Sequence, residues 1–118
     1  MLVDTSVWID HFAQANPRLV EALEAGTVES HPFVMGELAL GRLRWRDETL
    51  AYLAALPAAR AAEHEEALGL VVAHDLAGSG LGWVDAHLLA SALIGGTTIW
   101  TLDRQLAAVA TRLGVGAG

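Results

Sequence analysis

The chain has 118 residues, 53% of them hydrophobic, which is enough for one domain with a buried core and too apolar for a disordered protein. It has 14 acidic and 7 basic residues, all of the latter arginine. By itself this net charge of −7 disfavours a nucleic-acid partner, because phosphate binding normally rests on lysine and arginine. The absence of cysteine excludes disulfides and thiolate metal sites. An acidic excess gathered in one place still suits a site for bound cations.

The sequence pattern predicts neither a membrane segment nor a signal peptide. Its apolar stretches end well before the roughly 20 residues that a membrane helix needs. Strand-like sequence begins at Leu2 with no basic leader before it. We therefore expect a cytoplasmic protein with no membrane association, folded as a single domain over residues 1–118.

Short extended segments alternate with helices along the chain. The first half predicts a strand at Leu2–Asp4, helices at Ser6–Ala13 and Pro17–Ala25, a strand at Thr27–Ser30, and helices at Pro32–Leu43 and Asp47–Leu56. The second half predicts an extended piece at Ala58–Ala61, a helix at Glu63–Leu76, a loop at Ala77–Gly82, a helix at Val84–Ile94, a strand at Thr97–Thr101, a helix at Arg104–Leu113 and a fraying tail over residues 114–118. This alternation predicts an α/β fold with a central, mostly parallel sheet of short strands flanked by helices.

Four carboxylates are expected to meet at one edge of that sheet. Glu37, Asp85 and Asp103 have apolar residues three and four positions away on their own helices, which places them at buried surfaces. A buried carboxylate without a partner is costly, so each needs a cation, a hydrogen-bond donor or water. Asp4 and Asp103 follow strands, and the carboxyl ends of parallel strands share the edge where ligands bind. Glu37 and Asp85 lie early in helices that begin near the same edge.

Each of these acids also has a simpler structural role. Asp4 and Asp103 precede helices and suit N-caps. Asp85 suits the positive end of a helix dipole, and Glu37 suits a helix edge. Their joint placement favours a metal site, because four carboxylates with no lysine in the chain repel one another until a hard dication such as Mg²⁺ or Mn²⁺ binds.

Four stretches of the sequence, in order, resemble the PIN domain, and in particular the VapC toxins of toxin–antitoxin pairs. These stretches are VDTSVWI at the start, GELALG around Glu37, GWVDAHLLASAL around Asp85 and TIWTLDRQL around Asp103. The resemblance implies a PIN-like fold and a metal-dependent ribonuclease whose catalytic and metal-binding cluster is Asp4, Glu37, Asp85 and Asp103, supported by the hydroxyls of Thr5, Ser6 and Thr101. It also implies a homodimer and a cognate antitoxin that blocks the site.

The expected reaction is hydrolysis of an RNA phosphodiester by water activated on one or two Mg²⁺ or Mn²⁺ ions. Such a site needs no histidine base, and no histidine of this chain occupies a motif position. His87 is two residues from Asp85 and so projects elsewhere on its helix. We interpret it as an ordinary helix histidine.

The only basic cluster is RLRWR, residues 42–46. Arg42, Arg44 and Arg46 either contact RNA phosphates while Trp45 stacks on a base, or form a solvated helix end with Trp45 packed against a partner such as the antitoxin. Arg104 either reaches a substrate phosphate or pairs with an acid. Trp8, Trp83 and Trp100 are expected in the core or an interface.

Other protein classes also place aspartates at the ends of parallel strands. A phospho-accepting receiver module needs a lysine late in the chain, and this chain has none. A phosphatase of the haloacid dehalogenase type needs an aspartate two residues after its nucleophile, where this chain has Ser6. A non-catalytic PIN-like binding protein is the stronger alternative to a ribonuclease, and the intact set of four acids favours the enzyme.

Overall fold

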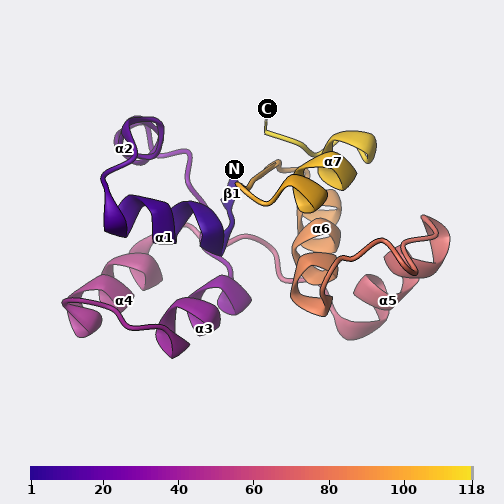
Figure 1. Ribbon diagram of the computed structural model, residues 1–118, viewed down its shortest axis with the longest axis horizontal. Coiled ribbons are helices and arrows are strands. Elements are labelled where there is room, and N and C mark those ends of the chain that lie inside the picture. The colour runs from indigo at the N-terminus through magenta and orange to yellow at the C-terminus, as the bar shows by residue number, and fades with distance from the viewer. Residues whose placement is uncertain (118) are drawn as a thin grey trace.

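The structure is a computed structural model that describes residues 1–117 (Figure 1). The strands in this range are β1 (Leu2–Val3) and β2 (Ile99–Trp100). The helices in it are α1 (Thr5–Ala13), α2 (Pro17–Glu24), α3 (Pro32–Leu40), α4 (Arg46–Ala55), α5 (His64–Ala73), α6 (Trp83–Gly95) and α7 (Arg104–Arg112). Helices α1 to α4 lie on one side of β1, and α5 to α7 lie on the other (Figure 1). Nowhere in the described part of the chain does a helix have the length and apolar character needed to cross a bilayer.

The sheet is parallel, as predicted, but its outer strands are reduced to single bridges. β1 pairs with β2 in the register Leu2 to Ile99 and Val3 to Trp100. Further parallel bridges join Leu2 to Glu29 and Ser30 to Ala58. The extended segments predicted near residues 27–30 and 58–61 therefore belong to the sheet, although neither forms a regular strand.

The prediction that the C-terminal tail frays is wrong for residues 115–117. The Ile99 N–H donates to the Val115 carbonyl at 2.7 Å, and the Ala117 N–H donates to the Ile99 carbonyl at 2.9 Å. This parallel pairing extends the sheet beyond β2, and the Val115 side chain is buried. The glycines on either side of Val115 are disfavoured in strands, which hid this edge segment from sequence reasoning. Residue 118 lies outside the described range.

The helix that was predicted to run from Pro32 to Leu43 ends at Leu40. Gly41 takes an extended conformation directly after it, which stops the helix. In the loop that follows, Trp45 has a φ of 57°, a left-handed conformation that is uncommon outside glycine. The side chains of residues 42–45 therefore do not continue a helix face.

The core surrounds the two paired strands. The side chains of β1 and β2 are all buried, as expected for a parallel sheet covered on both faces. Trp8 and Trp100 are buried as predicted, with the Arg18 guanidinium 4.2 Å above the Trp100 ring. Trp83, by contrast, is 43% exposed, so it is not a core residue.

Candidate active site

Asp4 lies where β1 ends. Its backbone N–H donates to the Trp100 carbonyl at 2.9 Å, which fixes this residue at the edge of the sheet. It occupies the N-cap position of α1, but its side chain makes no capping hydrogen bond. Instead its Oδ2 accepts hydrogen bonds from the hydroxyls of Ser6 and Thr101, each at 2.7 Å. The N-cap interpretation is therefore wrong for this carboxylate, which the two hydroxyls orient.

The same two hydroxyls tie the start of α1 to the loop after β2. Ser6 Oγ lies 3.3 Å from Thr101 Oγ1 and accepts the Leu102 N–H at 3.0 Å. Thr101 Oγ1 accepts the Asp103 N–H at 3.0 Å. Since each hydroxyl donates to Asp4 and accepts a backbone N–H, both have a fixed orientation.

Glu37 reaches the same region from the second turn of α3. The Thr5 hydroxyl donates to its Oε1 at 2.6 Å, across the contact between α1 and α3. Thr5, Ser6 and Thr101, the three hydroxyl residues predicted to support the acids, therefore each bond to one of them.

Asp103 and Asp85 each use one oxygen to cap a helix. Asp103 Oδ1 accepts the N–H groups of Gln105 and Leu106 at 2.9 and 3.0 Å, so its predicted capping role is confirmed. Asp85 Oδ2 accepts the Gly82 N–H at 3.0 Å, ahead of α6. Both carboxylates are thus fixed by backbone donors at the starts of their helices.

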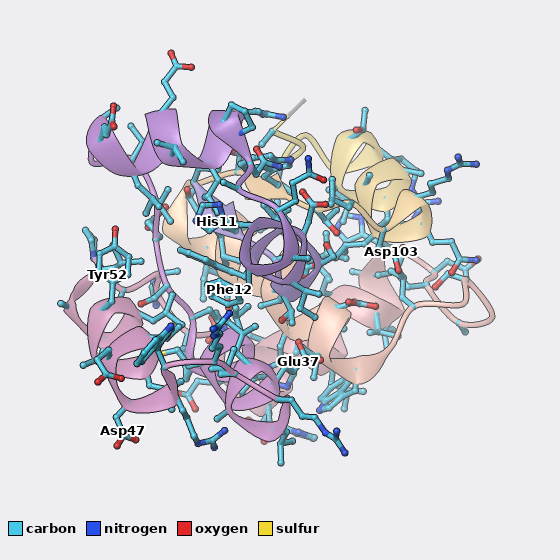
Figure 2. The ribbon with its side chains drawn as sticks, turned by 60° about the vertical axis from the view of Figure 1, so that its left-hand side comes forward. His11, Phe12, Glu37, Asp47, Tyr52 and Asp103 are labelled. Atoms are coloured by element: carbon cyan, nitrogen blue, oxygen red, sulfur yellow. The ribbon has the colours of Figure 1, made fainter. Side chains whose placement is uncertain are left out.

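The other three carboxylates lie close enough to Asp85 to affect its pKa. Burial raises the pKa of Asp85, and the charges of Asp4, Asp103 and Glu37 raise it further against the lowering effect of the Gly82 N–H. Figure 2 shows Glu37 and Asp103 on the same face of the molecule. Within residues 1–117 the one ion pair joins the Met1 amine to Glu29, so none of the four acids is in an ion pair there. The predicted pairing of Arg104 with an acid is therefore not formed.

The donor set fits a hard dication. In the described range, the second oxygen of each of the four acids accepts no hydrogen bond from the protein; these oxygens are Asp4 Oδ1, Glu37 Oε2, Asp85 Oδ1 and Asp103 Oδ2. As the side chains of residues 1–117 stand, no three acids or histidines are close enough together to share one ion. Binding of one ion by three or more of these acids therefore requires their side chains to rotate toward it.

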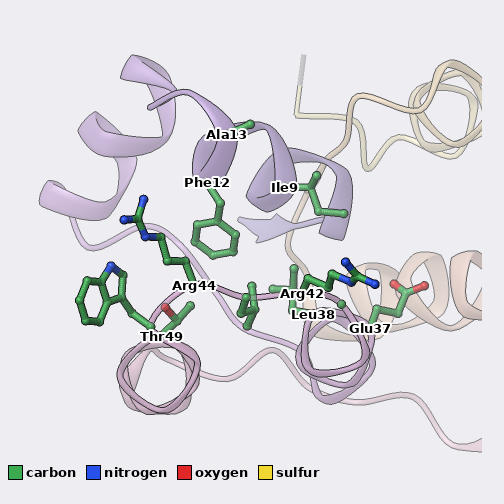
Figure 3. A pocket seen from close by; sticks show the side chains of 11 residues that line it. Ile9, Phe12, Ala13, Glu37, Leu38, Arg42, Arg44 and Thr49 are labelled. Atoms are coloured by element: carbon green, nitrogen blue, oxygen red, sulfur yellow. The ribbon is translucent and has the colours of Figure 1, made fainter.

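A groove of about 650 Å³ begins beside Glu37 and runs between α1, α3 and α4. Ile9 and Phe12 of α1 line one wall, and Arg42 lies beside Glu37 at one end (Figure 3). Arg44 and Trp45 also line it, and Trp45 is 70% exposed. Arg42 and Arg44 lie in the loop between α3 and α4, so the prediction of a solvated helix end is wrong for them. Their side chains instead give the groove a basic part next to the acidic cluster.

His31 is one of the buried polar residues that sequence reasoning missed. It is 1% exposed, and it caps α3 by accepting the Phe33 N–H on Nδ1 at 3.0 Å. A signal was present, because His31 directly precedes Pro32 and so stands where an N-cap is expected. His87 is buried against the rings of Phe33 and Trp83, with both pairs of ring centroids 4.7 Å apart, and its side chain makes no hydrogen bond to any of the four acids within residues 1–117.

Comparison with known proteins identifies the family of the chain. The family model of the PIN domain matches residues 1–112. Ribonuclease VapC32 of Mycobacterium tuberculosis, in strains CDC 1551 / Oshkosh and ATCC 25618 / H37Rv, is 48% identical over 116 residues, which cover 98% of this chain and 94% of the relative. The crystal structure of PAE2754 from Pyrobaculum aerophilum shares the fold with a TM-score of 0.59 at 20% identity, covering 96% of this chain and 88% of that one. The chain therefore belongs to the PIN-domain family and, within it, to the VapC type.

Proposed function

We propose that this chain is a toxin ribonuclease that hydrolyses RNA phosphodiesters with Mg²⁺ or Mn²⁺ held by Asp4, Glu37, Asp85 and Asp103. The observation that carries the proposal is that four carboxylates from distant parts of the chain come close enough for Asp4, Asp103 and Glu37 to raise the pKa of Asp85. Each keeps one oxygen free of hydrogen bonds from the protein, and none forms an ion pair within residues 1–117. The name of the relative at 48% identity, a ribonuclease, supports it.

Each of the four acids is held in place through one of its two carboxylate oxygens. Ser6 and Thr101 orient Asp4, and Thr5 holds Glu37. Backbone N–H groups hold Asp85 and Asp103. The opposite oxygen of each acid is left for one or two cations, which when bound would lower the pKa of a water molecule and neutralise charge on the phosphate.

The metal dependence gives the first test. RNA incubated with the purified chain and Mg²⁺ should be cleaved. A chelator should reduce this cleavage to the level seen with an Asp85→Asn variant purified in the same way. Added Mg²⁺ should then restore cleavage by the unmodified chain. Expression should arrest growth, and Asp85→Asn should relieve the arrest. Cleavage that ignores the chelator, or that is equal in the variant, would mean a contaminating nuclease. Absence of both RNA cleavage and Mn²⁺ binding in a folded chain would favour the non-catalytic PIN-like alternative.

The groove beside Glu37 is proposed to contact RNA or the antitoxin. Its arginines suit phosphates and its exposed Trp45 suits a base. Its apolar wall, with Ile9 and Phe12, suits an apolar segment of a protein partner. Arg46 is exposed beside the groove, and Arg104 stands next to Asp103 at the start of α7, where we propose that it contacts a substrate phosphate.

A double substitution separates the two uses of the groove. If RNA lies there, Arg42→Ala with Arg44→Ala should raise KM with little change in kcat. The slope of log affinity against log salt concentration should decrease in magnitude by about 1.4, which is about 0.7 for each of the two phosphates that are no longer neutralised. The matched control is Arg60→Ala with Arg112→Ala, which removes the same charge at exposed positions elsewhere. An unchanged KM together with weaker inhibition by the antitoxin would assign the groove to the antitoxin instead.

The proposal also includes a homodimer, a single PIN domain over the whole chain, and a cytoplasmic location, where the RNA substrate is found. Exposed apolar side chains on α5, Leu68 and Val72, suit burial against a second protomer. Light scattering on the purified chain should give a mass of two protomers. A monomeric mass at micromolar concentration would contradict the dimer and leave the proposed chemistry intact.

A further inference from the structure

His31 uses both nitrogens of its ring in hydrogen bonds although it is almost fully buried. Nδ1 accepts the Phe33 N–H at 3.0 Å, so this nitrogen carries no proton. The neutral ring must then carry its proton on Nε2, which lies 3.0 Å from Ser91 Oγ and donates to it. The ring therefore joins the start of α3 to the middle of α6.

Ser91 connects a third segment to the same point. It is fully buried in α6, and its Oγ also accepts the Ala62 N–H at 3.0 Å from the segment that leads into α5. Buried polar groups that are all satisfied in this way hold their elements in one arrangement, because moving any of them leaves an unpaired donor or acceptor. We call His31, Ser91 and the Ala62 N–H the buried link.

The two helices that this link joins each carry one acid of the candidate site. Glu37 follows His31 by six residues along α3, and Asp85 precedes Ser91 by six residues along α6. At the helical rise, six residues span about 9 Å, so a 10° change in the angle between the helices would move a carboxylate by about 1.5 Å. An error of about 1 Å in a reacting group is enough to cost about 100-fold in rate.

We infer that His31 is a positioning residue, which through Ser91 fixes α3 against α6 and so fixes Glu37 relative to Asp85. The inference rests on the nuclease function proposed above and adds a residue that none of the sequence motifs contains. Thr5 holds Glu37 from the α1 side, and the buried link holds the helix that carries it from the α6 side. His31 itself does not contact the substrate or the cations.

Two variants break the link in different ways. His31→Asn keeps a side-chain oxygen that can cap the Phe33 N–H, but the shorter side chain cannot reach Ser91. Ser91→Ala keeps the histidine cap and removes the hydroxyl that joins the three segments. The control is Leu19→Ala in α2, which removes buried apolar volume without touching the link.

The first readout needs no activity. The chain has no cysteine, so Gly36→Cys in α3 and Leu93→Cys in α6 provide two unique positions for spin labels. A side chain at residue 36 meets open space, and Leu93 is exposed. Labelled protein diluted with unlabelled protein should give a narrow distribution of distances between α3 and α6. The distribution should shift or broaden in His31→Asn and in Ser91→Ala, and it should stay narrow in Leu19→Ala.

The second readout is RNA cleavage with Mg²⁺. Both link variants should lose kcat by about 10- to 100-fold with KM within about twofold of the unmodified chain, because a positioning defect acts on the rate more than on binding. Leu19→Ala should keep kcat despite a lower melting temperature. Unchanged distances and unchanged kcat in both link variants would overturn the inference. If the unmodified chain does not cleave RNA at all, the proposed function fails, and the distance measurement still decides whether the link fixes α3 against α6.

Discussion

The Asp4→Asn variant is expected to cleave RNA more than about 100-fold more slowly than the unmodified chain. Removing a residue that only supports a metal ligand costs up to about 100-fold, and Asp4 is proposed to be a ligand itself. The amide oxygen of asparagine still accepts the hydroxyls of Ser6 and Thr101, so the local hydrogen bonds survive. The substitution removes one of four mutually repelling charges, so without divalent ions the variant should be at least as stable as the unmodified chain.

Metal binding makes this prediction measurable without a substrate. At a concentration of Mn²⁺ 100 times its dissociation constant, binding stabilises the folded chain by about 2.7 kcal/mol, which raises the melting temperature of a domain of this size by roughly 10 °C. Asp4→Asn should abolish most of that increase, and calorimetric titration should show a correspondingly weaker affinity. The matched control is Asp10→Asn, an exposed aspartate six residues along in α1. Equal Mn²⁺ affinity in the Asp4→Asn variant and the unmodified chain would remove Asp4 from the metal site.

Acid is expected to destabilise the protein through His31. Burial, and then the nearby His87, lower the pKa of His31 from 6.5 to about 4. Above pH 6.5 neither the folded nor the unfolded chain carries the proton, so the contribution of the neutral ring is complete. Between pH 6.5 and about 4 only the unfolded chain binds it, so the free energy of unfolding falls by about 1.4 kcal/mol per pH unit, or about 3 kcal/mol in all.

Urea unfolding of the unmodified chain and of His31→Asn, from pH 7.5 to pH 4, checks this effect. The stability advantage of the unmodified chain should shrink by about 3 kcal/mol across that range. The raised pKa of Asp85 acts with the opposite sign, because the folded chain then binds a proton more readily than the unfolded chain. That contribution is common to both proteins and cancels in the difference. Parallel pH curves for the two proteins would show that His31 does not bind its proton differently in the folded and unfolded states.

Much of the local structure was predictable because its signals are local. Pro17 and Pro32 mark the first residues of α2 and α3, and the alternation of short strands with helices predicted the parallel sheet. The exceptions have long-range causes. The tail residues 115–117 pair with Ile99, and no neighbouring residue signals that partner. Gly41 was a local signal that α3 stops early, but its effect on the groove depends on where α1 and α4 lie.

The candidate site likewise has features that the sequence predicts and features that only the tertiary structure shows. The sequence alone predicts Asp4, Glu37, Asp85 and Asp103 as a set, because their positions relative to strand ends and apolar helix faces can be read from the order of residues. Only the tertiary structure decided that Asp103 caps a helix while Asp4 does not, since that choice depends on the hydroxyl of Thr101, 97 residues away from Asp4 in the chain. It alone revealed the contact between His31 and Ser91, which are 60 residues apart. Helix periodicity and capping act within a few residues and can be predicted from neighbours, whereas a hydrogen bond between distant side chains exists only once packing has brought their helices together.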